Sequence, residues 1–419
     1  MAGKTIKIFF TDLKSYFDSG KYIFLFNLLE RLTFFAFYIS IARYVEQQTY
    51  GFIVSVFALT NIIATIFDFG IPFYIQRESA TNEDAKLSLY YSILIKLISI
   101  LVLLPIPFLY FGLGTEHWII IIVSLINFFS PVNQVLIFYL NGKYLFKENF
   151  RAILSARIPY LIFLIVATVL KINFYFSLTF ILFSLIVQNL ILSKIAECNY
   201  FDLTKVRVNL SSIISLLKKS LPFGLGIIFG MVYDRVDVLI IQKFLSNESV
   251  AIYSAAYSIY RNSSILSGIF LSKFYNDCSK YFLINRKIDL NTFLVNLRIL
   301  VCLSITLILI FNLFGDFLIQ LFFTSRFIYS AQVLGIVSFA IPFIFLNNLT
   351  GVALNAIHKE KITMISTFIG MIVNISFNLY LIPKIGIFGA VISTIITEWI
   401  ILVIQLCAIV FFNRIKKNV

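Results

Sequence analysis

Residues 22–43 read YIFLFNLLERLTFFAFYISIAR, an almost unbroken apolar run with a glutamate and an arginine near its centre. A run of this length is sufficient to cross the hydrocarbon core of a bilayer as one helix. No small-residue cleavage site follows it, so we expect the segment to stay in the mature protein. Eleven further apolar runs follow, and the predicted spans are 22–43, 50–71, 87–111, 117–140, 152–170, 173–193, 220–243, 249–272, 291–313, 327–356, 360–382 and 386–411.

The composition agrees with a chain that lies mostly in a membrane. Of its 419 residues 60% are hydrophobic and 13% are charged, which leaves too little polar surface for a soluble globular domain. The net charge of +14 sits in short segments beside apolar runs, a pattern that indicates contact with anionic lipid and no nucleic-acid partner. The predicted fold class is therefore an all-α polytopic membrane protein of about twelve transmembrane helices.

The distribution of lysine and arginine predicts the orientation of these spans. Most cations outside the spans lie in every second gap, counted from the segment before residue 22. By the positive-inside rule these gaps and both chain termini lie in the cytoplasm. The opposite gaps hold only five cations, namely Arg43, Lys171, Lys243, Arg326 and Lys384.

Two halves of the chain have similar features. Leu140-Asn141 and Leu354-Asn355 end the fourth and tenth spans, and two similar outer turns precede the second and eighth spans. Six helices per half would give both halves one orientation, as in a parallel repeat. We expect an N-terminal six-helix bundle at 1–200, a cytoplasmic linker at 201–219 and a C-terminal six-helix bundle at 220–419, around a central cavity.

Charged residues inside the spans are the candidate site residues, because an ionisable side chain is costly in a bilayer. We propose that the cations among them bind substrate; these are Arg31, Lys96, Arg157, Arg235, Arg261 and Arg298. The acidic residues are candidates for gating or ion coupling and are Glu30, Asp68, Asp234, Asp237 and Glu398. Guanidinium groups around a hydrated cavity would favour an anionic substrate, phosphate in particular.

A structural interpretation remains open for the same residues. Arg31 or Arg261 could form interhelical ion pairs with Asp234 or Asp237 that hold the helices together. The tyrosines and small residues of 251–258 are interpreted first as helix packing and second as a cavity wall. The chain lacks a phosphate-binding glycine loop, a metal-spaced His/Cys/Asp cluster and a nucleophile elbow, so we predict no catalytic residue, no metal and no cofactor.

Three stretches carry a family resemblance: LPFG at 221–224, YDRVDVLII at 233–241 and FLSNESVAIYSAAY at 244–257. They resemble the polysaccharide-biosynthesis flippases, the Wzx-like O-antigen or capsule repeat-unit translocases of the MATE-like MOP superfamily. The resemblance implies transfer of an undecaprenyl-diphosphate-linked oligosaccharide from the cytoplasmic to the outer leaflet of the bacterial inner membrane by alternating access. It also implies that Arg31, Arg235, Arg261 and Arg298 match the family's cavity cations.

The partners that follow from this resemblance are the lipid-linked oligosaccharide, membrane lipid, and a polysaccharide polymerase with its chain-length regulator. Three alternatives remain. A multidrug exporter of the same fold would favour a more acidic cavity than the small positive excess found here. A membrane polymerase or glycosyltransferase would need a large external loop, which the predicted spans leave no room for, and an assembly scaffold would not need embedded charges.

Overall fold

The computed structural model describes residues 2–82, 85–112, 114, 116–170, 172–200, 202 and 209–415, with side chains between 21 and 412 except 269 and 272. In this part of the chain the backbone is almost entirely helical and contains no strand. Ten of its helices are long and apolar enough to cross a membrane. The protein is therefore an all-α multi-pass membrane protein, as predicted. Lys171 and residues 201 and 203–208 of the predicted linker lie outside the described residues.

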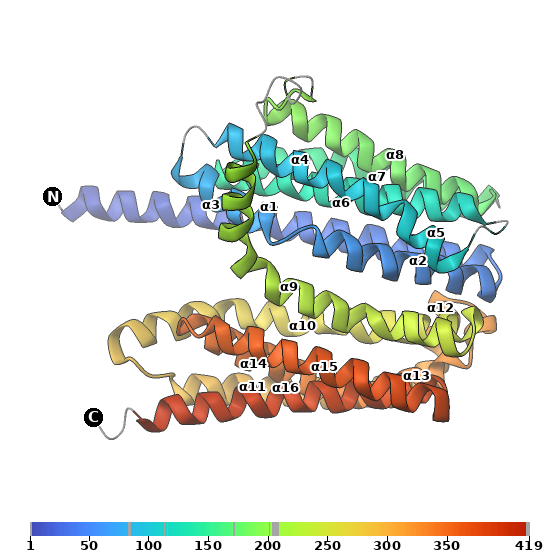
Figure 1. Cartoon of the computed structure of the whole chain (residues 1–419). Helices are drawn as coiled ribbons and strands as arrows, with labels where there is room; N and C mark the ends of the chain where they lie inside the picture. Colours follow the sequence, from blue (N-terminus) through green and yellow to red (C-terminus); the bar gives the residue numbers. More distant parts are fainter. Residues whose placement is uncertain are drawn as a thin grey trace. The chain divides into compact units, whose positions relative to one another are not determined.

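The chain divides into two compact units, of which the first comprises Met1–Val45 and Thr60–Leu225. Its central helix is α6, which packs against α3, α4, α7 and α8, while α1 packs along α7 (Figure 1). The helices up to residue 195 are α1 (Ala2–Tyr44), α2 (Gln47–Ile66), α3 (Ile71–Thr81), α4 (Lys86–Leu103), α5 (Pro105–Phe111), α6 (His117–Gly142), α7 (Phe146–Leu170) and α8 (Phe174–Ile195).

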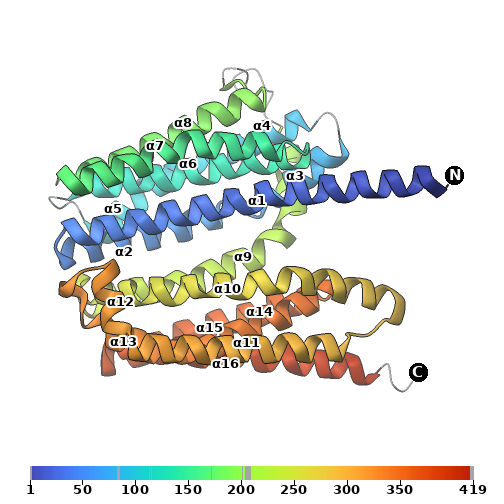
Figure 2. The same ribbon diagram turned by 180° about the vertical axis from the view of Figure 1, so that it is seen from behind.

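The second unit comprises Glu46–Leu59 and Gly226–Val419. It therefore includes most of α2, although the predicted bundle at 1–200 contains those residues. Its central helix is α14, which packs against α10, α11, α15 and α16 (Figure 2). The remaining helices are α9 (Leu210–Phe244), α10 (Asn247–Asn285), α11 (Leu290–Leu313), α12 (Gly315–Phe322), α13 (Ser330–Val337), α14 (Ile341–Ala356), α15 (Glu360–Ile385) and α16 (Ile387–Ile415), with 3-10 turns at Ser325–Phe327 and Ser338–Ala340.

Two predicted spans are interrupted next to prolines. The span expected at 87–111 is divided into α4 and α5, and Pro105 is the first residue of α5. The span expected at 327–356 becomes two 3-10 turns, α13 and α14, with Pro342 in the first turn of α14. Proline has no N–H to donate within a helix but is well tolerated in the first turn, so a new helix begins at each site.

The seventh and eighth predicted spans lie within α9 and α10, which have 35 and 39 residues. Both are long enough to cross a bilayer. Neither is among the ten helices that are apolar throughout such a length. The reason is their polar content, because α9 contains Asp234, Arg235 and Asp237, and α10 contains Arg261 with many serines and tyrosines. The two predicted spans that are not among these ten thus carry the densest group of candidate site residues.

Corresponding polar contacts recur in the two units, with their donor residues 214 positions apart. Asn133 Nδ2 donates to the Leu185 carbonyl at 3.0 Å, and Asn347 Nδ2 donates to the Glu398 carbonyl at 2.9 Å. In the next turns, Asn141 Oδ1 accepts from Asn149 Nδ2 at 2.7 Å. The counterparts of that second pair, at positions 355 and 363, make the equivalent contact at 3.3 Å. The central helices also pack against equivalent neighbours, so the two units share a packing pattern.

The turn between α2 and α3 packs tightly on α9 within the first unit. Phe69 and Gly70 have φ values of 47° and 72°, in the left-handed region that favours glycine. A Cβ on Gly70 would lie 2.4 Å from the backbone nitrogen of Gly224, and a Cβ on Gly224 would lie 2.4 Å from the Phe69 carbonyl carbon. Two glycines therefore permit a backbone contact that any side chain would prevent.

Candidate functional site

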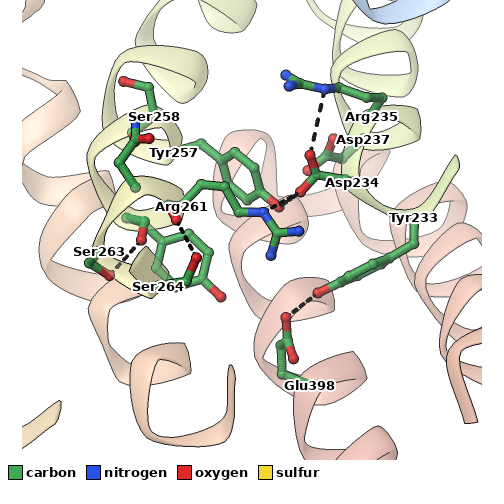
Figure 3. A network of polar contacts seen from close by, with 12 residues as sticks. Tyr233, Asp234, Arg235, Asp237, Tyr257, Ser258, Arg261, Ser263, Ser264 and Glu398 are labelled. Atoms are coloured by element: carbon green, nitrogen blue, oxygen red, sulfur yellow. Dashed lines mark hydrogen bonds and ion pairs between the residues drawn. The ribbon is translucent and has the colours of Figure 1, made fainter. Parts of the chain in front are cut away.

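Arg261 and Asp234 form the centre of a polar cluster in the second unit. Arg261 Nε lies 2.9 Å from Asp234 Oδ1, and the Tyr257 hydroxyl donates to the same oxygen at 3.0 Å. Arg235 Nε lies 3.5 Å from Asp234 Oδ2. Figure 3 shows Arg261 reaching from α10 toward the Asp234 carboxylate on α9. The ion pair left open by the sequence thus exists, between two helices of one compact unit.

Helical spacing explains how these side chains converge. Tyr253, Tyr257 and Arg261 are each four residues apart on α10, and Asp234 and Asp237 are three apart on α9, so each set shares one face of its helix. The Tyr253 hydroxyl donates to Asp237 Oδ2. The rings of Tyr253 and Tyr257 stack with centroids 5.3 Å apart. These tyrosines were expected chiefly to pack helices, but they orient both aspartates.

Glu398 is a buried carboxylate in the same unit. The Tyr233 hydroxyl donates to its Oε1 at 2.6 Å, and Asn347 Nδ2 donates to its Oε2 at 2.6 Å. Both direct donors are neutral, and Glu398 also interacts electrostatically with Arg261. A buried carboxylate that is held by neutral donors remains able to take up a proton or a cation. Neither Tyr233 nor Asn347 carries a charge, so the search for embedded charges missed them.

The side chain of Arg261 is partly accessible. Its side chain is 42% exposed, whereas that of Asp234 is 11% exposed. Arginine carries five N–H donors, and the ion pair with Asp234 involves Nε. The outer nitrogens can therefore donate to an anion while Asp234 and Tyr257 hold the side chain in place. This arrangement suits planar, bidentate recognition of a phosphate or carboxylate.

A second polar feature, which the sequence analysis overlooked, lies on α15. Asn374 and Asn378 are fully buried, and Asn378 Nδ2 donates to Asn374 Oδ1 at 2.8 Å. Asn374 Nδ2 and Asn378 Oδ1 have no hydrogen-bond partner among the described residues. Two asparagines four apart in the middle of a predicted span are the signal that could have revealed them. Where the chain is described, no group of three His, Cys, Asp or Glu residues is placed to hold a metal ion.

Lys96 and Asp68 form a closed ion pair in the first unit. The Lys96 ammonium contacts Asp68 Oδ1 directly and also donates to the Phe67 carbonyl at 3.2 Å. The Lys96 side chain is 1% exposed. Because the carboxylate and the carbonyl already occupy this ammonium, the pair secures the turn after α2.

Arg157, Glu30 and Arg31 come together elsewhere in the first unit. Arg157 is fully buried on α7, and its Nη1 donates to Ser184 Oγ of α8 at 3.0 Å. Glu30 interacts electrostatically with both Arg157 and Arg31. Arg31 is exposed on α1, and Arg298 is exposed on α11. The predicted site residues thus separate into the Asp234 and Arg261 cluster, the closed Lys96 pair, the Glu30 group and Arg298.

The class of protein follows from the fold. The chain has the fold of MOP superfamily transporters. It resembles the structure titled "Lipid II flippase MurJ, inward closed conformation", with a TM-score of 0.69, 18% identity and coverage of 92% of this chain and 87% of that one. An inward-facing MATE multidrug resistance transporter gives a TM-score of 0.70 at 14% identity, covering 91% and 93%. A MOP superfamily transporter from Pyrococcus furiosus gives 0.62 at 13% identity, covering 95% and 96%.

The family itself follows from the sequence comparison. Residues 18–273, more than half of the chain, match the model of the family described as "Polysaccharide biosynthesis protein". The protein belongs to this family, which confirms the resemblance drawn from residues 221–257. A curated relative, "Uncharacterized membrane protein MJ1068" of Methanocaldococcus jannaschii, is 30% identical over 105 residues. That match spans 25% of this chain and 20% of the relative's own length.

Proposed function

We propose that this protein is a flippase that moves a lipid-linked oligosaccharide across the membrane by alternating access. The cargo would be an O-antigen or capsule repeat unit on undecaprenyl diphosphate, carried from the cytoplasmic to the outer leaflet of a bacterial inner membrane. Membership of the polysaccharide biosynthesis family supports the cargo class, and the MOP transporter fold supports the type of movement. Both termini would lie in the cytoplasm.

The observation that carries this proposal is the partly open guanidinium of Arg261 within a predicted span. Arg261 is held by Asp234 and Tyr257 but keeps N–H donors available. A diphosphate offers two adjacent acidic groups, which arginine binds more specifically than lysine does because its donors are planar and paired. In this mechanism Arg261 and Arg235 bind the diphosphate, and Asp234 exchanges partners as the substrate binds and leaves. Arg31 and Arg298 would contact the anionic part of the cargo at other stages.

Asp237 and Glu398 are the proposed ion-coupling groups. Both are buried and both accept hydrogen bonds from tyrosine hydroxyls. Uptake of a proton or a metal cation by either carboxylate would change which donors it holds, and could thereby favour one orientation of the transporter over the other. We do not assign a role in catalysis to any residue. A polymerase and a chain-length regulator would act on the product after transfer.

The direct test is transfer of fluorescent undecaprenyl-diphosphate oligosaccharide in vesicles that contain the purified full-length protein. The fraction of substrate that reaches the opposite leaflet would be measured with an impermeant quencher. We expect the wild type and Arg77→Gln to transfer the lipid, Arg261→Gln to lose transfer and Arg261→Lys to retain part of it. Arg77 is an exposed cation of α3 and serves as a matched control. Normal transfer by Arg261→Gln would remove this residue from the pathway.

A second candidate function, export of cationic compounds, is favoured by one specific observation. The cluster in the second unit contains three carboxylates, Asp234, Asp237 and Glu398, beside only two arginines, Arg235 and Arg261. A site with this balance could also hold a cation. Ethidium efflux from the same vesicles would separate the two functions, because a flippase should not release ethidium and an exporter should not transfer the lipid.

A further inference from the structure

A buried arginine in the first unit lacks part of its hydrogen bonding. Arg157 is fully buried, and Ser184 Oγ is its hydrogen-bond acceptor at 3.0 Å. Ser184 in turn donates to the Ala156 carbonyl at 2.8 Å. Arg157 Nε and Nη2 have no partner among the described residues, and neither does the buried hydroxyl of Tyr160 one turn along α7. A buried guanidinium without a direct counterion is unfavourable, so this arrangement calls for a carboxylate nearby.

Glu30 is the acidic residue placed to supply that carboxylate. It lies on α1, which packs along α7. Phe34, one turn further on the same face of α1, lies over the Arg157 guanidinium at 5.7 Å from its ring centroid. Glu30 interacts electrostatically with Arg157 and also with Arg31, its neighbour in the chain. It therefore interacts with one buried cation and one exposed cation.

We propose that Glu30 exchanges between Arg31 and Arg157, and that an anion bound by Arg31 drives the carboxylate inward to Arg157. A diphosphate at Arg31 would repel the Glu30 carboxylate, while Arg157 has unpartnered N–H groups ready to receive it. Formation of that buried pair would draw α1 toward α7 and so signal that the site is occupied. Arg157 and Glu30 are positioning residues in this scheme, since neither contacts the substrate. The trigger rests on the proposed function, whereas the exchange between the two arginines does not.

The exchange can be tested without any substrate. We would measure the Tm of the purified full-length protein in nanodiscs for the wild type, Arg31→Gln, Glu30→Gln and the double variant. Arg157 can take the carboxylate when Arg31 is removed, so Arg31→Gln and the control Arg77→Gln should each change the Tm by less than about 2 °C. Glu30→Gln leaves the buried Arg157 without a carboxylate and should lower the Tm by more than that, and the double variant should resemble Glu30→Gln. A fall in Arg31→Gln as large as that in Glu30→Gln, or an unchanged Tm in Glu30→Gln, would overturn the proposal.

A second arm adds undecaprenyl diphosphate to the same nanodiscs and follows its binding. In the wild type we expect Arg157→Gln to weaken binding about fivefold, because Glu30 can no longer be withdrawn. In a Glu30→Gln background Arg157→Gln should have no effect on binding, and an equal effect there would overturn the relay. If the lipid does not bind the wild type while the substrate-free arm holds, the proposed function fails and the exchange of Glu30 stands. If Arg157→Gln does not fold, the substrate-free arm still decides the proposal.

Discussion

The ion pair of Lys96 with Asp68 and that of Arg261 with Asp234 both lie within predicted membrane spans. They differ in how far the cationic side chain is exposed. The Lys96 side chain is 1% exposed and also donates to a backbone carbonyl. The Arg261 side chain is 42% exposed and keeps N–H groups free of the carboxylate. An ammonium is a compact point charge, and a guanidinium is a planar fork with more donors than one carboxylate can use.

This difference separates a structural pair from one that can change partners. The closed pair holds the turn after α2, which in turn contacts the backbone of α9 at Gly224. The open pair belongs to the polar cluster of α9, α10 and α16, where tyrosines already orient the carboxylates. Loss of the closed pair should therefore affect stability, and loss of the open pair should affect transport.

The largest expected effect is on stability, from Lys96→Met. This change leaves Asp68 buried without its counterion and should lower the free energy of unfolding by about 3–5 kcal/mol. Thermal unfolding of the full-length protein in detergent measures it. The double variant Lys96→Met/Asp68→Leu should recover most of the loss, since neither charge then remains. An unaltered Tm in the single variant would contradict a structural role.

Arg261→Gln should impair lipid transfer more than it lowers stability. Arg261 is partly exposed, and Asp234 keeps Arg235 and the Tyr257 hydroxyl as partners when Arg261 is removed, so the loss of stability should stay at about 1 kcal/mol. Loss of its charged hydrogen bonds to a diphosphate should remove about 1.5–3 kcal/mol of interaction, which lowers transfer about tenfold or more. The measurement pairs Tm with lipid transfer in vesicles. A large fall in Tm with transfer retained would assign this pair to the structural class instead.

Gly224→Ala should disturb the closed pair without changing its charges. The new Cβ would lie 2.4 Å from the Phe69 carbonyl carbon, so the turn that holds Asp68 must shift. Overpacking of this kind destabilises by about 1–3 kcal/mol. Gly230→Ala is the matched control in the same helix, because a Cβ there meets nothing within 4 Å. That control should be neutral or more stable by up to about 1 kcal/mol, since alanine favours a helix. Equal Tm values for the two variants would exclude a tight contact.

The smallest expected effect is from Tyr257→Phe in the open cluster. It removes the 3.0 Å hydrogen bond to Asp234 while keeping the ring in place. The free energy of unfolding should fall by about 1 kcal/mol, the usual net value of one such bond. Chemical denaturation can resolve this against the exposed control Tyr144→Phe. A change no larger than that of the control would mean that Tyr257 does not help to orient Asp234.

Much of the fold could be predicted because each span carries its own signal. Apolar length is a local property, and it identified most of the helices. The divisions at Pro105 and Pro342 were missed because proline continues some helices, as at Pro131, and begins others. Whether a proline interrupts a span depends on what its neighbours can supply to the unpaired backbone groups.

The candidate site was predicted less completely, for a related reason. Charge alone drew attention to Asp234 and Arg261, but the roles of Tyr233, Asn347 and Asn378 depend on contacts between helices far apart in the chain. Spacing on one helix shows which residues share a face and does not show what that face meets.

The amino-acid order therefore established a multi-pass helical membrane protein with ionisable groups in its spans, because the hydrophobic effect and the cost of burying charge act on each segment locally. Only the folded structure distinguished Lys96, enclosed by Asp68 and a carbonyl, from Arg261, which stays partly open. In sequence each of the two cations is a single basic residue within a predicted span. Their different access arises from how neighbouring helices pack, which depends on all of the side chains at the contact together.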